Sequence, residues 1–201
     1  MTKTEVRNVI IKCAQLYRDN LCNKELLFFY LAGSKIQYIS VSYYPANYKH
    51  LTGIVISCSP KDFFELCCKQ TISENAFTLK DNGTTELKLR VLERIMNVAY
   101  HAQFLGDYLN SNIYLELDKV VGSTLCGLGI ENSDSDTYYP KSVLNGDMRK
   151  QVIEMKPIVA VYERLLWNSN YKLVRMKDSI TDKQRQEILS IINSAVTNRQ
   201  R

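Results

Sequence analysis

Histidine, tryptophan and proline are scarce in this sequence, whose 201 residues include two histidines, one tryptophan and four prolines. The six cysteines form no CxxC pair and share no metal-ligand spacing with His50 or His101. Structural zinc sites need a set of such ligands at short intervals, so the sequence argues against one. We expect reduced, mostly buried thiols, no metal site and no cofactor.

Long apolar runs are also absent. No uninterrupted stretch reaches the roughly 18 apolar residues that a bilayer-spanning helix needs. The first seven residues, MTKTEVR, lack the apolar region of a secretory signal. We therefore expect a soluble, cytoplasmic protein that has no membrane partner.

The sequence has no feature that would divide it into separate units. It has no internal repeat, low-complexity tract or Gly/Ser linker, and 201 residues are short for two independent cores. We expect a single domain over residues 1–201. Its parts are an N-terminal helix within 1–22, an α+β core over 26–177 and a C-terminal helix over 180–198.

The charge balance is moderately basic. A formal net charge of +5 and a pI of about 8.8 favour an anionic partner but do not require nucleic acid. Basic residues outnumber acidic ones from Arg164 to the end of the chain. This bias predicts a basic C-terminal surface, which is either a nucleic-acid contact or an ordinary solvated face.

Helix signals occur at four places. Capping-box pairs, Thr2 with Glu5 and Thr181 with Gln184, predict a first helix to about Asn20 and a final helix lined by isoleucines. Ser59 before a proline predicts a helix over 63–69. One long helix is expected after residue 83 from an apolar stripe at helical spacing: Leu87, Val91, Ile95, Val98, Ala102 and Leu105.

Strand signals fall between these helices. Residues 26–31 and 36–43 are rich in aromatic and β-branched side chains and flank a glycine-containing turn, which predicts a β-hairpin. Residues 112–117 with 120–130, and 158–166 with 171–176, predict two more strand pairs, and residues 131–137 an exposed loop. Helices and strands do not alternate strictly, so we expect an α+β fold with a mainly antiparallel sheet flanked by helices.

His50 is the first candidate for chemistry. Pro45 ends the preceding strand, so residues 46–52 are predicted to form a loop that carries this imidazole. Imidazole exchanges protons near neutral pH, and loops on a rigid sheet often carry catalytic groups, although a single histidine is more often structural. His101 shares a helical face with Arg94 and Asn97, opposite the apolar stripe. We expect it to face solvent and to have no catalytic role.

Several segments carry a resemblance to a known family. Residues 47–53 (NYKHLTG), 59–67 (SPKDFFELC), 125–130 (LCGLGI) and 139–144 (YPKSVL) occur in this order. Together they resemble the phage-associated branch of the Barnase, EndoU, colicin and RelE-like nucleases. The resemblance spans roughly residues 26–177, without the first helix and the tail, and residues 139–144 correspond to the loop after a strand.

The resemblance implies a compact sheet flanked by helices and metal-independent cleavage of RNA. In that reaction a base removes the 2′-hydroxyl proton, an acid protonates the leaving oxygen, and cations steady the charged phosphorane. The catalytic assignments that follow are His50 as base or acid, Thr52 and Ser142 as phosphate contacts, and Lys49 as a balancing charge.

Three further residues are candidate substrate contacts. The family match makes Lys141 a supporting cation, and Tyr139 is an aromatic side chain on which a base of single-stranded RNA could stack. Lys172 is chosen from the basic last strand rather than from a motif. Tyr43, Tyr44 and Tyr138 are aromatic candidates of the same kind, although core packing explains most tyrosines.

The sequence departs from the family in one respect. It has no convincing second catalytic histidine, so a two-histidine mechanism of the EndoU kind is not expected, and a one-histidine or lysine-assisted mechanism is required instead. A metal nuclease is an alternative, because Glu116 and Asp118 are two residues apart and would share a strand face.

Three functional hypotheses therefore stay open. The leading one is a metal-independent ribonuclease from a phage or other mobile element, with RNA as its partner. The second is a catalytically inactive nuclease-like phage protein that binds and inhibits a host defence complex, which the missing second histidine and the abundant tyrosine favour. The third is a nucleic-acid-binding regulator, which would bind with steep salt dependence and without turnover.

Overall fold

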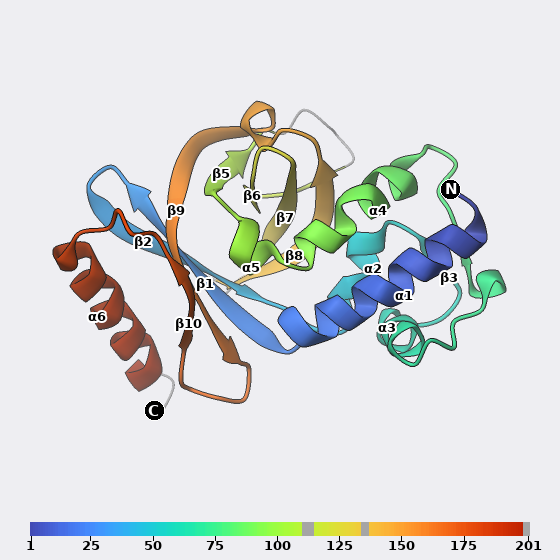
Figure 1. The fold of residues 1–201 in the computed structure, drawn as a ribbon, viewed down its shortest axis with the longest axis horizontal. Coiled ribbons are helices and arrows are strands. Elements are labelled where there is room, and N and C mark those ends of the chain that lie inside the picture. Colours follow the sequence, from blue (N-terminus) through green and yellow to red (C-terminus); the bar gives the residue numbers. More distant parts are fainter. Residues whose placement is uncertain (110–114, 134–136, 199–201) are drawn as a thin grey trace.

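A computed structural model describes residues 1–109, 115–133 and 137–198 of the chain. Helices gather at one side of a large curved sheet, and a last helix lies at the opposite side (Figure 1). The fold is α+β with a mostly antiparallel sheet flanked by helices, as predicted.

Within these described residues, helices occupy the following segments: α1 (Lys3–Asn20), α2 (Asn47–Thr52), α3 (Pro60–Cys68), η1 (Glu74–Ala76), α4 (Thr84–Ile95), α5 (Val98–His101), η2 (Met148–Lys150) and α6 (Asp182–Asn198). The strands are β1 (Lys24–Ala32), β2 (Lys35–Ser42), β3 (Val55–Ile56), β4 (Phe77–Thr78), β5 (Phe104–Tyr108), β6 (Lys119–Gly122), β7 (Cys126–Ser133), β8 (Thr137–Asn145), β9 (Val152–Leu165) and β10 (Lys172–Met176).

The main sheet curls until it closes. Its strand order is β1-β2-β8-β7-β6-β5-β9-β10, and β9 also pairs with β1, so β1, β2 and β5–β9 form a ring of hydrogen-bonded neighbours. All of these pairings are antiparallel except the short β2–β8 contact, which is parallel. Long β9 makes the closure possible, because its first half pairs with β5 and its second half with β1.

Strand β1 of the β1–β2 hairpin is buried on both faces. Leu26 and Phe28 of β1 pack in the main core with the buried face of α1, whereas Leu27 and Phe29 pack in a second core that contains Ile188 of α6. Successive strand residues point to opposite sides, so α1 and α6 cover opposite faces of this part of the sheet.

Local signals predicted several elements correctly. Thr2 and Glu5 form the capping box that begins α1, and Ser59 caps α3 ahead of Pro60. The Thr181 hydroxyl accepts a hydrogen bond from the Gln184 main-chain N–H at 3.2 Å, which completes the box before α6. The β1–β2 hairpin and the β9–β10 pair also lie where they were predicted.

The prediction of one long helix over residues 87–105 was wrong. The segment forms α4, then the short α5, and then Phe104 and Leu105 begin β5. Leu87 is 50% exposed, and the buried face of α4 is instead Leu89, Leu92 and Ile95. Pairing of residues 104–108 with both β6 and β9 outweighs their helical periodicity.

Four other predicted segments differ from the structure. Residues 47–52 form α2 rather than a loop, and residues 139–144 lie inside β8 rather than in a loop. Residues 131–133 continue β7, and the rest of that predicted loop up to 136 lies outside the described residues. The predicted strand 112–117 falls partly outside them as well, and residues 115–117 are not in a strand.

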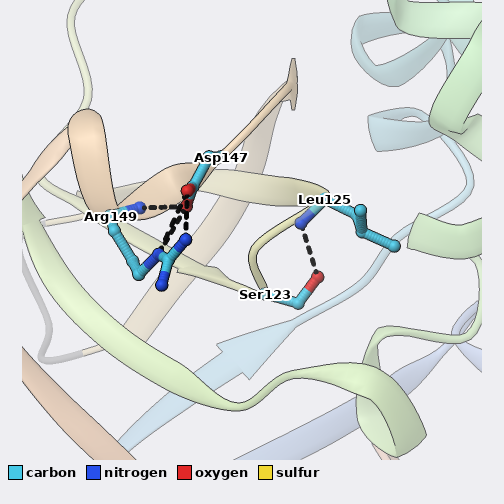
Figure 2. Close-up of polar contacts among 4 residues, drawn as sticks. All are labelled: Ser123, Leu125, Asp147 and Arg149. Atoms are coloured by element: carbon cyan, nitrogen blue, oxygen red, sulfur yellow. Dashed lines mark hydrogen bonds and ion pairs between the residues drawn. The ribbon is translucent and has the colours of Figure 1, made fainter.

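Short polar contacts shape the turns at one end of the β6–β8 sheet. The Ser123 hydroxyl accepts a hydrogen bond from the Leu125 main-chain N–H at 3.3 Å in the β6–β7 turn (Figure 2). Asp147 caps η2 by accepting from the Arg149 main-chain N–H at 3.0 Å, and the Arg149 guanidinium also binds the Asp147 carboxylate (Figure 2). The Asp147–Arg149 contacts fix the chain between β8 and β9, between Asn145 and Gln151 that line the pocket described below.

Candidate active site

The segment NYKHLTG forms helix α2 and its C-terminal cap. Tyr48 and Leu51 are three residues apart and fully buried, and the Tyr48 hydroxyl donates to the Ile10 carbonyl of α1 at 2.6 Å. This inner face leaves Lys49 and His50 on the outer side of the helix, where His50 is exposed. A packed helix, rather than a loop, therefore positions the imidazole.

Thr52 is fully buried and supports the helix end. Its hydroxyl donates to the Lys49 carbonyl at 2.8 Å and accepts from the Ile54 main-chain N–H at 3.4 Å. These bonds satisfy main-chain groups that the end of a helix leaves without partners. The hydroxyl is thus occupied inside the fold, and the structure does not present it to a phosphate.

Gly53 allows α4 to approach α2 closely. Its φ is +70°, in the left-handed region, and a Cβ atom there would lie 2.7 Å from Cδ of Lys88. The buried Thr85 hydroxyl donates to the Gly53 carbonyl at 2.8 Å, which joins the two helices. Glycine at this position lets the Lys88 side chain pass over the end of α2.

Lys88 is the residue that sequence reasoning missed. Its ammonium donates to the main-chain carbonyl of His50 at 3.1 Å, although the two residues are 38 apart in sequence. Burial lowers the pKa of Lys88 to about 8, with further lowering from the Lys80 and Lys49 charges. No sequence motif marks this lysine, and its nearest signal is the glycine that makes room for it.

The pKa of His50 is also lowered. Partial burial is the main cause, followed by the charges of Lys49, Lys141 and Lys88, and Glu131 opposes them. An imidazole whose pKa lies below its usual value is mostly neutral at pH 7 and can accept a proton. The structure therefore places a neutral imidazole among ammonium groups from α2, α4 and β8.

Strand β8 supplies the other side of the cluster. A β-bulge opposite Gly129 and Ile130 leaves Lys141 without a register partner, and its ammonium binds the Glu131 carboxylate at 2.6 Å. The ring of Tyr139 packs 5.8 Å from that of Tyr44, which directly precedes Pro45 and α2. Lys141 and Tyr139 therefore lie on the His50 side of the sheet.

Ser142 is almost fully buried and lines a pocket between α4 and β8. The pocket has a volume of about 430 Å³, and its lining includes both Lys80 and Lys88. Its position next to the His50–Lys88 contact makes it the concave part of the site.

The structure does not bring Lys172 to this cluster. Lys172 lies on β10 and lines a different pocket with Lys24 and Arg164. Along the sheet, β10 is four strand spacings from β8 through β9, β1 and β2, which is about 19 Å. Arg164 does not add to a basic C-terminal surface either, because it is buried in an ion pair with Glu25.

The described residues contain no group of three or more His, Cys, Asp or Glu side chains arranged to hold a metal ion. Glu116 and Asp118 precede β6 rather than sharing a strand face, and the Asp118 carboxylate accepts a hydrogen bond from the Asn132 main-chain N–H. All six cysteines are unpaired thiols.

Comparison with known proteins identifies the family of the chain. A family model described as phage-Barnase-EndoU-ColicinE5/D-RelE like nuclease4 matches residues 9–179. The chain belongs to this nuclease family. The match covers most of α1, which the sequence resemblance left outside, and it ends before α6. No curated protein and no solved structure matches the chain.

Membership of this nuclease family identifies nucleic acid as the class of substrate. Among the described residues, no helix has both the length and the apolar character needed to cross a bilayer. The lysines around the exposed His50 and at the adjoining pocket carry positive charge, which attracts an anion such as a phosphodiester.

Proposed function

We propose that this nuclease is a metal-independent endoribonuclease of phage or mobile-element origin that cleaves RNA by attack of the 2′-hydroxyl. The observation that carries the proposal is the pairing of His50 and Lys88, whose pKa values are both lowered and whose helices are joined by a 3.1 Å hydrogen bond. A metal-free nuclease needs both a base and an acid near neutral pH, and these residues supply one of each.

The reaction is balanced by two proton transfers. Neutral His50 removes the 2′-hydroxyl proton, and the 2′-oxygen attacks the adjacent phosphorus to form a cyclic phosphate. The bond to the 5′-oxygen breaks, and protonated Lys88 donates a proton to that leaving oxygen. Lys49 and Lys141 offset the charge that develops on the phosphorane.

The remaining candidates have supporting roles in this proposal. Thr52 positions His50 by closing the end of α2, and Ser142 shapes the pocket wall. Tyr139, packed on Tyr44, offers an aromatic surface for an RNA base beside Lys141. Six unpaired thiols suit a reducing compartment, so we place the reaction in the cytoplasm.

The test is cleavage of a DNA oligonucleotide that contains a single ribonucleotide, with excess chelator present. We expect the wild type to cut only beside the ribonucleotide, since only that position has a 2′-hydroxyl. His50→Ala should slow cleavage by about 10²–10⁴-fold, the usual contribution of a proton-transfer group. His101→Ala is the matched control, because His101 is exposed at the end of α5, and it should keep the wild-type rate.

Three results would refute this proposal: no cleavage by the wild type, loss of cleavage on chelation, or an undiminished rate in His50→Ala.

Binding without catalysis is the second candidate function, in which the protein inhibits a host defence complex. Trp167 favours it, because this residue is 72% exposed between β9 and β10, and Leu165 and Leu173 on these two strands are exposed as well. In that case a host protein or ribonucleoprotein would co-purify equally well with wild type and His50→Ala.

A further inference from the structure

The pocket beside the His50–Lys88 contact has walls of two chemical kinds. Its volume of about 430 Å³ is within the range of sites for small organic ligands. Three segments build it: residues 80–88 around the start of α4, residues 142–145 at the end of β8, and Gln151 before β9. Leu115 completes the lining.

One part of the lining is apolar. Leu87 projects from α4 and stays 50% exposed, although it belongs to an otherwise amphipathic helix. Leu144 of β8 is nearly buried and lines the same pocket. Exposed leucine at the edge of a pocket is a surface on which a flat aromatic ligand can lie.

The other part of the lining is made of carboxamides and cations. Asn82, Asn145 and Gln151 each carry a donor and an acceptor, which suits the hydrogen-bonding edge of a nucleobase. The Asn82 oxygen already accepts from the main-chain N–H and the hydroxyl of Thr84, so a ligand would meet its NH₂ group. Lys80 and Lys88 place two ammonium groups at the same pocket.

We propose that this pocket binds one nucleotide of the RNA, next to the phosphate that is cleaved. The base lies against Leu87 and Leu144, its edge contacts the carboxamides, and Lys80 holds the phosphate on the side of Lys88. This inference rests on the proposed function and deepens it, because Lys88 belongs both to the pocket and to the catalytic pair.

A base pocket beside the scissile phosphate makes cleavage depend on sequence. The nucleotide that fits the carboxamides best positions its own phosphate at His50 and Lys88, whereas a base of poor fit covers these carboxamides without bonding to them and leaves them without water. We therefore expect the nuclease to cut preferentially beside one base or one class of base, rather than at every phosphodiester.

Equilibrium binding to the intact protein tests the pocket without cleavage. The probes are the four ribonucleoside 3′-monophosphates and inorganic phosphate, titrated by calorimetry or NMR. One nucleotide should bind at least about tenfold more tightly than phosphate, because the base adds contacts that phosphate lacks. Asn145→Ala and Leu87→Ala should each weaken that nucleotide by about tenfold and leave phosphate unchanged.

Leu125→Ala is the matched control for Leu87→Ala, since Leu125 is 54% exposed in the β6–β7 turn and does not line the pocket. Mapping of cleavage ends adds a second readout, in which Asn145→Ala should flatten the base preference of the wild type. Nucleotides that bind no better than phosphate, or variants that bind like wild type, would overturn the pocket assignment.

The two proposals fail in different ways. If His50→Ala abolishes cleavage but no nucleotide binds more tightly than phosphate, the proposed ribonuclease activity is retained and the assignment of the base pocket is wrong. If a nucleotide binds tightly and Leu87→Ala weakens it while His50→Ala cleaves at full rate, the pocket stands and the catalytic assignment is wrong.

Discussion

The Lys88 ammonium donates to the main-chain carbonyl of His50 rather than to its imidazole, at a distance of 3.1 Å. The contact ties α4 to α2 and leaves the imidazole ring free of this bond. It also holds a cation close to the histidine, which helps to lower the pKa of His50. The same geometry therefore prepares a neutral base and supplies a candidate acid.

The pH dependence of cleavage should have two limbs. Activity should rise with pH as His50 loses its proton, at a pKa below the usual 6.5, and fall as Lys88 loses its proton at about 8. Lys88→Arg keeps the charge but cannot lose its proton in this range, so the alkaline fall should disappear while kcat/KM at pH 7 drops about 10²-fold. The measurement is kcat/KM from pH 5 to 10.

Lys49→Arg serves as the control for that experiment, since Lys49 offsets charge and transfers no proton in the proposed mechanism. It should keep both limbs of the profile. An alkaline limb that persists unchanged in Lys88→Arg would assign the acid to another group.

Gly53→Ala should both destabilise the protein and impair the site. The left-handed backbone costs an alanine about 1 kcal/mol, and the new Cβ would meet Cδ of Lys88 at 2.7 Å. Gly33→Ala is the matched control, because Gly33 has a similar φ of +62° and open space around it. Urea unfolding should show a loss of about 1 kcal/mol in both variants.

Only Gly53→Ala should also slow cleavage, because only it displaces Lys88. Equal cleavage by the two glycine variants would mean that the passage of Lys88 over Gly53 is unimportant for activity.

The buried ion pair of Glu25 and Arg164 should dominate the stability of the β1–β9 junction. Their side chains are 1% and 9% exposed, Ser40 donates to Glu25, and Arg164 also donates to the Asn168 carbonyl at 2.7 Å. Arg164→Met should lower the free energy of unfolding by about 3–5 kcal/mol, since it removes the cation that compensates the buried Glu25 carboxylate.

Lys12→Met is the comparison for this variant, because the Lys12–Glu93 pair is mostly exposed and solvent screens its attraction, so its loss should destabilise the protein far less. Urea unfolding of both variants measures the difference. A similar loss of unfolding free energy in the two variants would show that burial does not increase the contribution of the Glu25–Arg164 pair to stability.

Local chemistry in the sequence predicted much of the fold. Capping pairs such as Thr2 with Glu5 located helix starts, because a cap depends only on residues within one turn. The helix of residues 47–52 was missed, since its stability comes from burying Tyr48 and Leu51 against other helices rather than from capping. The change from helix to strand at Phe104 was missed because pairing with β6 and β9, which are distant in sequence, decides it.

The candidate site also contains some residues that local sequence patterns indicate and others that only the tertiary structure brings together. The amino-acid sequence made His50 and Lys141 candidates, because the short segments that carry them resemble those of the nuclease family, and their roles stay predictions. It could not select Lys88, whose position beside His50 and lowered pKa arise only when α2, α4 and β8 come together. Burial and neighbouring charges set a pKa, and both are properties of the folded chain. Folding likewise buried Thr52 completely: its hydroxyl bonds only to Lys49 and Ile54 nearby in the sequence, but α4 and β8, which pack on α2, come from distant parts of the chain.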